Sequence, residues 1–134
     1  MAGVTLLELM MVVVVIGILG AIAIPSYRAY SMRAHRTDAK NALLSLATSQ
    51  ERYYLKHRTY GTLAQLAAEG YPTASEYGMY TLAVTVNNAT TFTATAAPAA
   101  GGGTNGVDMT KDTQCTAFSI DARGVRGASS PNCW

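Results

Sequence analysis

The stretch GVTLLELMMVVVVIGILGAIAIPSY, residues 3–27, decides the fold of this chain. No residue from Leu9 to Ile24 is charged, and Val4–Leu7 extends the apolar run. The run then holds about twenty residues, which as an α-helix are enough to cross a hydrocarbon core of about 30 Å. The sequence therefore predicts a membrane-spanning helix at the N-terminus.

Glu8 interrupts this apolar run. An ionised carboxylate among leucines costs about 3 kcal/mol or more in a membrane unless it meets a cation or takes up a proton. Glu8 either lies near a helix end and reaches the lipid headgroups, or it awaits a positively charged partner. A secretory signal peptide carries its small-residue cleavage site after the apolar stretch, whereas Gly3 precedes it here. On these residues alone, an ordinary signal anchor stays open.

Residues 3–27 resemble the N-terminus of type IV pilins. The shared features are a glycine before the cleaved bond, a glutamate at the fifth position after it, an uninterrupted apolar run and a proline at its end. The resemblance implies that a prepilin peptidase cuts after Gly3 and that the new N-terminus at Val4 is methylated. It also implies that Glu8 pairs with the N-terminal amine of a neighbouring subunit, and that Pro25 belongs to the assembly helix.

Beyond Pro25 the pattern becomes amphipathic. No glycine or proline occurs from Ala29 to Lys56, and apolar or large side chains recur there at three- and four-residue steps. These positions are Ala39, Ala42, Leu43, Leu46, Ala47, Gln50, Tyr53 and Tyr54. We expect one helix from Val4 to about Lys56, roughly 80 Å long, with a kink or local loosening at Pro25. Its apolar stripe should pack on a sheet, and its basic face should be solvated or meet the acids of neighbouring subunits.

Alternating residues in the second half predict a small antiparallel sheet. The expected elements are a helical turn at Thr62–Ala68, strands at Tyr80–Val86, Thr91–Ala97 and Cys115–Asp121, a turn at Asn87-Asn88 and a short strand around Val125. The predicted fold class is α+β, with a long N-terminal helix on a sheet of about four strands. This half also resembles the PilE-like minor pilins in Tyr53-Tyr54, Arg58-Thr59-Tyr60, the first strand and the final Cys133-Trp134.

The predicted division of the chain follows from these patterns. Residues 1–3 are a leader remnant, residues 4–28 the transmembrane and assembly helix, and residues 29–134 a globular domain outside the inner membrane. The resemblance implies a single-pass inner-membrane subunit that later enters an extracellular pilus. Its implied partners are other pilins, the prepilin peptidase and the inner-membrane assembly machinery.

The chain has two cysteines, Cys115 and Cys133. Two cysteines with no histidine nearby in sequence cannot form a four-ligand zinc site. With a membrane segment upstream, they predict one disulfide in an oxidising compartment, worth about 3 kcal/mol in the chain-entropy model. The alternative is a pair of reduced thiols in a cytosolic protein.

The charge is unevenly distributed. Between Arg28 and Arg58 the sequence has seven basic and two acidic residues, whereas after Tyr60 it has three basic and five acidic residues. A net charge of +2 is too small for a dedicated nucleic-acid binder. Candidate contacts to DNA or to a surface are Lys111, Arg123 and Arg126. Three cations support only a weak, salt-sensitive contact, and scattered surface charge is the alternative interpretation.

No motif predicts catalysis. The sequence has no metal-spaced cluster, no glycine-rich phosphate loop and no nucleophile with a base, so we predict no enzyme and no cofactor. The leading hypothesis is a structural subunit of a type IV pilus that supports motility, adhesion or DNA uptake. The alternatives are a DNA- or surface-binding minor pilin acting through the loop between the cysteines, and a pseudopilin of type II secretion.

Overall fold

Two compact units make up this computed structural model, which describes residues 3–104 and 106–134. The first unit ends at Arg33, and the second, called the head below, runs from Ala34 to Trp134. Both contain part of α1 (Leu6–His57), a helix of 52 residues that is unbroken at Pro25. The predicted long helix is thus confirmed.

The first unit exposes its apolar side chains. Every large apolar residue from Val4 to Ile24 is more than half exposed, and none of the most apolar window of α1 is buried. By length and composition, α1 is able to cross a membrane. Since apolar surface on this scale is unfavourable in water, this unit requires lipid or other protein chains around it.

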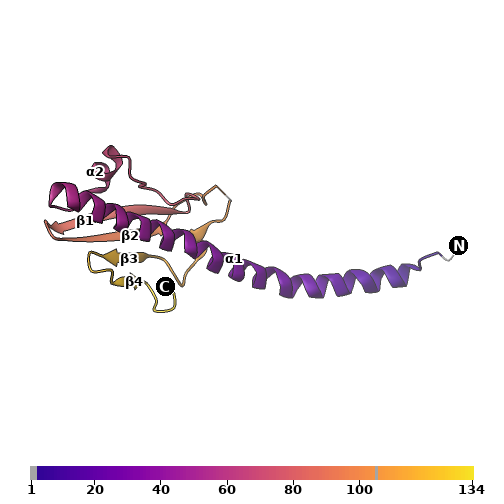
Figure 1. The fold of residues 1–134 in the computed structure, drawn as a ribbon. Helices are drawn as coiled ribbons and strands as arrows, with labels where there is room; N and C mark the ends of the chain where they lie inside the picture. Colours follow the sequence, from indigo (N-terminus) through magenta and orange to yellow (C-terminus); the bar gives the residue numbers. More distant parts are fainter. Residues whose placement is uncertain (1–2, 105) are drawn as a thin grey trace. The chain divides into compact units, whose positions relative to one another are not determined.

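In the head, the C-terminal half of α1 lies across one face of a four-stranded sheet (Figure 1). All neighbouring strands are antiparallel and follow chain order. The strands are β1 (Tyr80–Asn88), β2 (Thr91–Pro98), β3 (Phe118–Asp121) and β4 (Arg126–Ala128). The predicted α+β fold, with a long helix on about four antiparallel strands, is therefore confirmed.

The core forms between the apolar stripe of α1 and alternate residues of the sheet. Leu43 and Leu46 are fully buried, as are Ala94 and Ala96 on β2. The small side chains on β2 leave room for the leucines of the helix, because protein interiors are packed without voids. Of the predicted stripe, Ala42, Ala47 and Tyr54 are only half-buried, and the other members are buried.

Two strand boundaries differ from the prediction. Asn87 and Asn88 were predicted as a turn but belong to β1. The Asn88 side-chain oxygen accepts hydrogen bonds from the Thr90 backbone N–H and hydroxyl, so the turn comes after Asn88. β3 begins at Phe118 and not at Cys115. The Cys115 N–H donates to the Asp112 carboxylate, which draws this segment away from strand pairing.

A short second helix follows α1. In α2 (Leu63–Ala68), the Thr62 hydroxyl accepts from the Gln65 backbone N–H while the Gln65 side chain accepts from the Thr62 N–H, a reciprocal cap. The predicted helical turn is thus confirmed. Between the helices, the fully buried Gln50 side chain bonds both the N–H and the carbonyl of Gly61.

One basic residue of α1, Arg36, departs from the prediction of a solvated basic face, whereas the other basic residues of the helix are exposed or half-buried. Arg36 is only 9% exposed, and its guanidinium donates to both carboxylate oxygens of Asp112, at 2.6 and 2.9 Å. Asp112 follows the 3-10 helix η1 (Met109–Lys111) and also accepts from the backbone of Gln114 and Cys115. The pair thus joins α1 to the segment that precedes β3.

Asp112→Asn should destabilise the head by about 3 kcal/mol, because it leaves a buried arginine without its counter-charge. Burial opposes ionisation, but the Arg36 guanidinium and backbone N–H groups outweigh it and lower the pKa of Asp112. Because the pKa of Asp112 is lower in the folded state, ionised Asp112 stabilises the fold at any pH above its unfolded-state pKa of about 3.9. This stability is lost as the pH falls through the folded-state pKa. Urea unfolding of the detergent-solubilised chain, followed by Trp134 fluorescence between pH 3 and pH 7, measures both effects.

Asp108→Asn is the matched control. Asp108 caps η1 and is more exposed than Asp112, and asparagine caps as well as aspartate does. We expect a change within about 0.5 kcal/mol. Equal losses in the two variants would contradict the special role of the buried pair.

Arg58→Gly should stabilise the head by about 0.5 to 1 kcal/mol, because Arg58 ends α1 in the left-handed conformation (φ 59°) that glycine adopts without steric cost. Leu55→Gly, at an exposed position inside α1, should instead destabilise it by about 1 kcal/mol. The same urea titration checks both signs. Destabilisation by Arg58→Gly would show that the arginine side chain stabilises the folded monomer.

Candidate functional site

Of the candidate processing and assembly residues, Gly3 and Val4 precede α1, Glu8 lies in its first turn and Pro25 lies inside it. Val4 is 72% exposed, and Glu8 is exposed as well. The Glu8 backbone N–H donates to the Thr5 hydroxyl, so Thr5 caps the helix and Glu8 lies in its first turn. A carboxylate is favourable there because the helix N-terminus carries partial positive charge. This local role leaves the carboxylate accessible to a partner.

The C-terminal loop of the head is closed by a disulfide between Cys115 and Cys133, 18 residues apart. The loop contains β3 and β4, and Trp134 follows it. The Trp134 ring packs edge-on against Phe118, and its indole N–H donates to the Gly127 carbonyl. The disulfide and the indole thus hold the loop against the core from its C-terminal end.

Arg123 and Arg126 lie on either side of the β3–β4 turn. The Asp121 carboxylate holds this turn by accepting from the backbone N–H groups of Arg123 and Val125. The Arg123 guanidinium also donates to Asp121, and that of Arg126 lies 5.2 Å from the centre of the Trp134 ring. Both arginines are exposed, so the turn presents two cations to the solvent.

The charge state of Asp121 keeps this turn in place. Its backbone hydrogen bond from Val125 is the largest cause of a lowered pKa, and the Arg123 guanidinium adds to it. The carboxylate therefore stays ionised at neutral pH and keeps accepting from the turn.

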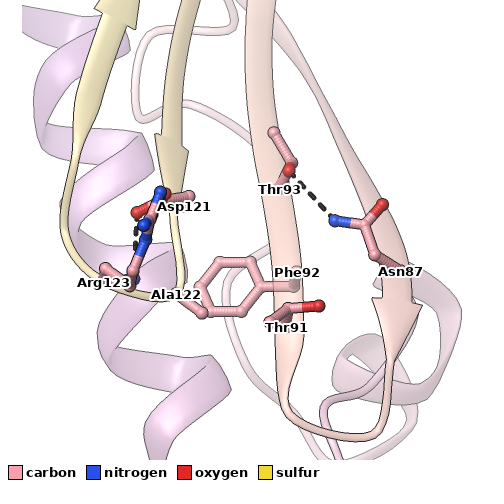
Figure 2. Close-up of a pocket in the computed structure, with 7 residues that line it drawn as sticks. All are labelled: Asn87, Thr91, Phe92, Thr93, Asp121, Ala122 and Arg123. Carbon is pink, nitrogen blue, oxygen red and sulfur yellow. Dashed lines mark hydrogen bonds and ion pairs between the residues drawn. The ribbon is translucent and has the colours of Figure 1, made fainter.

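A pocket of about 420 Å³ lies between this turn and the β1–β2 hairpin. Figure 2 shows its lining, with the Asn87 amide donating to the Thr93 hydroxyl on one side and the Arg123–Asp121 pair on the other. The lining residues are Asn87, Thr91, Phe92, Thr93, Asp121, Ala122 and Arg123. Hydroxyl, amide and guanidinium groups thus surround a small apolar floor.

Lys111 does not join this group. Asp112, the neighbour of Lys111, forms an ion pair with Arg36 near the start of the head's part of α1. The β3–β4 turn instead lies beside Thr48, further along the same helix, because Asp121 and Gly124 line a pocket with Thr48. Twelve helical residues separate Arg36 from Thr48, about 18 Å along the axis. The structure therefore brings Arg123 and Arg126 together but places Lys111 towards the opposite end of the sheet.

Asn87, Thr93 and Asp121 were not among the site residues predicted from the sequence. The alternating threonines of the second strand and the aspartate three residues before Gly124 were visible as turn and strand signals. Their convergence at one end of the sheet depends on strand register. Within the described residues, no group of three His, Cys, Asp or Glu is arranged to hold a metal ion.

Known proteins share both the sequence and the fold. The chain is 34% identical to the type IV major pilin protein PilE1 of Neisseria gonorrhoeae over 64% of its length and 52% of the relative's. It is 42% identical to the type IV major pilin protein PilA of Myxococcus xanthus over 46% of its length and 28% of that protein. The chain thus spans about half, or less, of these curated relatives.

A solved structure shows the same fold. The non-core minor pilin PilV of Neisseria meningitidis superposes with a TM-score of 0.52 at 20% identity, over 77% of this chain and 91% of that one. A family described as type IV minor pilin ComP, DNA uptake sequence receptor, matches residues 25–130. Because that match covers most of the chain, this protein belongs to the ComP family of type IV minor pilins.

Proposed function

We propose that this type IV pilin is a minor subunit of a pilus and that its head binds duplex DNA during DNA uptake. The observation that supports this best is the match of residues 25–130 to a family described as a DNA uptake sequence receptor. That family is one of structural pilins, so we propose binding and no catalysis. The type II secretion pseudopilin, the alternative within the superfamily, is less well supported, because the relatives reported above are pilins.

In the proposed route, the chain first enters the inner membrane through residues 4–28 and is cut after Gly3. The exposed apolar surface of the first unit supports this step, since it needs lipid before assembly and other helices afterwards. The amine freed at Val4 is the partner that we propose for Glu8 of a neighbouring subunit. A buried carboxylate is tolerable when it is matched by a cation in this way. Residues 29–134 then lie outside the cell on the pilus.

We assign the DNA contact to the β3–β4 turn. Both Arg123 and Arg126 are exposed there, and Arg123 shares the pocket wall with the amide and hydroxyl groups of Asn87 and Thr93. Guanidinium groups pair well with phosphate oxygens, and neutral polar groups add hydrogen bonds to sugar or base edges. Two cations in one subunit give a weak and salt-sensitive contact, so several subunits along a fibre would act together.

Glu8→Gln should abolish or strongly reduce incorporation into filaments while leaving membrane insertion unchanged. Glutamine keeps the helix-capping capacity of the side chain but removes the charge that pairs with the amine. Immunoblots of sheared filaments and of membrane fractions separate the two steps. Thr5→Ala, which removes the cap but keeps the charge, is the control and should assemble. Normal incorporation of Glu8→Gln would contradict the pairing.

Arg123→Ala combined with Arg126→Ala should weaken DNA retention by filaments and flatten its salt dependence. Each phosphate contact contributes about 0.9 to the slope of log K against log salt concentration, so the slope should fall by about 2. Retention of labelled duplex between 50 and 200 mM salt measures it. Lys111→Ala removes an exposed cation at the other end of the sheet. If it lowers DNA retention as much as the double variant does, the binding depends on overall charge and not on the β3–β4 turn. Unchanged retention by the double variant would contradict the proposed interface.

A further inference from the structure

The Asp38 carboxylate is buried without a counter-charge. Asp38 is 6% exposed, and one of its oxygens accepts from the Tyr77 N–H at 3.3 Å. Among the described residues, its other oxygen has no hydrogen-bond partner, and no cation lies within ion-pair distance of either. The nearby Arg36 guanidinium is committed to Asp112 and to Gln114. A buried charge in this condition destabilises the fold unless a cation from elsewhere approaches it.

A pocket beside Asp38 gives a cation that approach. Its volume is about 360 Å³, and its wall includes the exposed Glu76 carboxylate, the Asn41 amide and the Thr37 hydroxyl. His35 is the one titratable base on the described wall, which holds no lysine or arginine. The pocket thus combines two carboxylates with neutral acceptors and suits a guanidinium group, which is planar and carries several donors.

The opposite end of the head carries an arginine without an acidic partner. Arg58 ends α1, is exposed, and lies within ion-pair distance of no carboxylate among the described residues. Its positive φ is a conformation that glycine would adopt at lower cost. An arginine at a strained surface position is a candidate for a contact outside the monomer.

We propose that Arg58 of one copy enters the Asp38 pocket of a second copy in the filament. Subunits of a fibre face the same way, and such growth requires a head-to-tail contact between two different surfaces of the chain. Asp38 lies on α1 and Arg58 directly follows its last residue, twenty residues and about 30 Å further along the axis. Two parallel copies shifted by about that distance bring the cation of one to the carboxylates of the other. This inference rests on the proposed assembly into a pilus.

A cysteine pair tests the contact in the full chain. Arg58→Cys and Glu76→Cys are introduced together, the chain is expressed as the predominant pilin, and sheared filaments are oxidised mildly. The expected result is a ladder of multiples of the subunit mass on a non-reducing gel. Each single variant should stay monomeric, because the contact joins two different surfaces. The control pair, Glu76→Cys with Val125→Cys, uses another exposed residue and should give no ladder.

A charge exchange provides the second readout, and it also decides the case if the cysteine pair does not assemble. Arg58→Glu and Glu76→Arg should each reduce the filament pool about tenfold, which is the effect of losing about 1.4 kcal/mol per contact. The two changes together should restore the pool. Failure of restoration overturns the proposal, and so does an unchanged pool in both single variants.

Other outcomes separate the proposals. Loss of filaments on chelation of divalent cations, with no cross-linking, would assign the pocket to a metal ion and overturn the contact between copies. Wild-type filaments without a ladder in the cysteine pair would overturn this inference alone. Absence of wild-type filaments would overturn this inference, whereas the proposed pilus function would be overturned only by absence of the wild-type chain from filaments of other pilins.

Discussion

The buried pair between Arg36 and Asp112 is the constraint on which the head depends. It joins the start of the head's part of α1 to the segment just before the disulfide loop, across 76 positions of sequence. The same carboxylate accepts from the Cys115 N–H, so the pair also sets where the loop begins. A charged pair out of water is tolerated only with such complete hydrogen bonding. The loop that bears the β3–β4 turn is therefore anchored at one end by this pair and at the other by the disulfide.

The helix α1 serves two different environments with one secondary structure. From Leu9 to Ile24 its side chains are apolar on all sides, and none of that surface is covered by the chain itself. In the head, the same helix has a buried stripe against the sheet and polar residues elsewhere. A helix that is apolar on all sides is stable only within lipid or protein, whereas an amphipathic one suits a small head in water. The change in pattern after Pro25 therefore separates the part that needs lipid or protein around it from the part that suits water.

The head is small, and its surface features lie at its two ends. At one end, the hairpin and the β3–β4 turn surround a polar pocket with the exposed Arg123 on its wall. At the other end, the Asp38 pocket has two carboxylates and lies near the ion pair that anchors the loop. This separation allows one surface to contact a ligand while another contacts a neighbouring subunit. The meander of four short strands supports both because its register fixes the ends of the sheet relative to α1.

The sequence by itself determined the long helix, the amphipathic stripe, the alternation of the strands and the number of cysteines. These are local properties, set by periodicity and by the polarity of neighbouring residues. Only the tertiary structure decided that Arg36 is buried, that Asp38 has no counter-charge among the described residues, and that Lys111 lies apart from Arg123 and Arg126. Each of these facts depends on contacts between residues far apart in the chain, which propensity and spacing do not encode. The turn at Ala89-Thr90 was missed for a related reason, since a side-chain hydrogen bond of Asn88, and not residue type alone, sets where the strand ends.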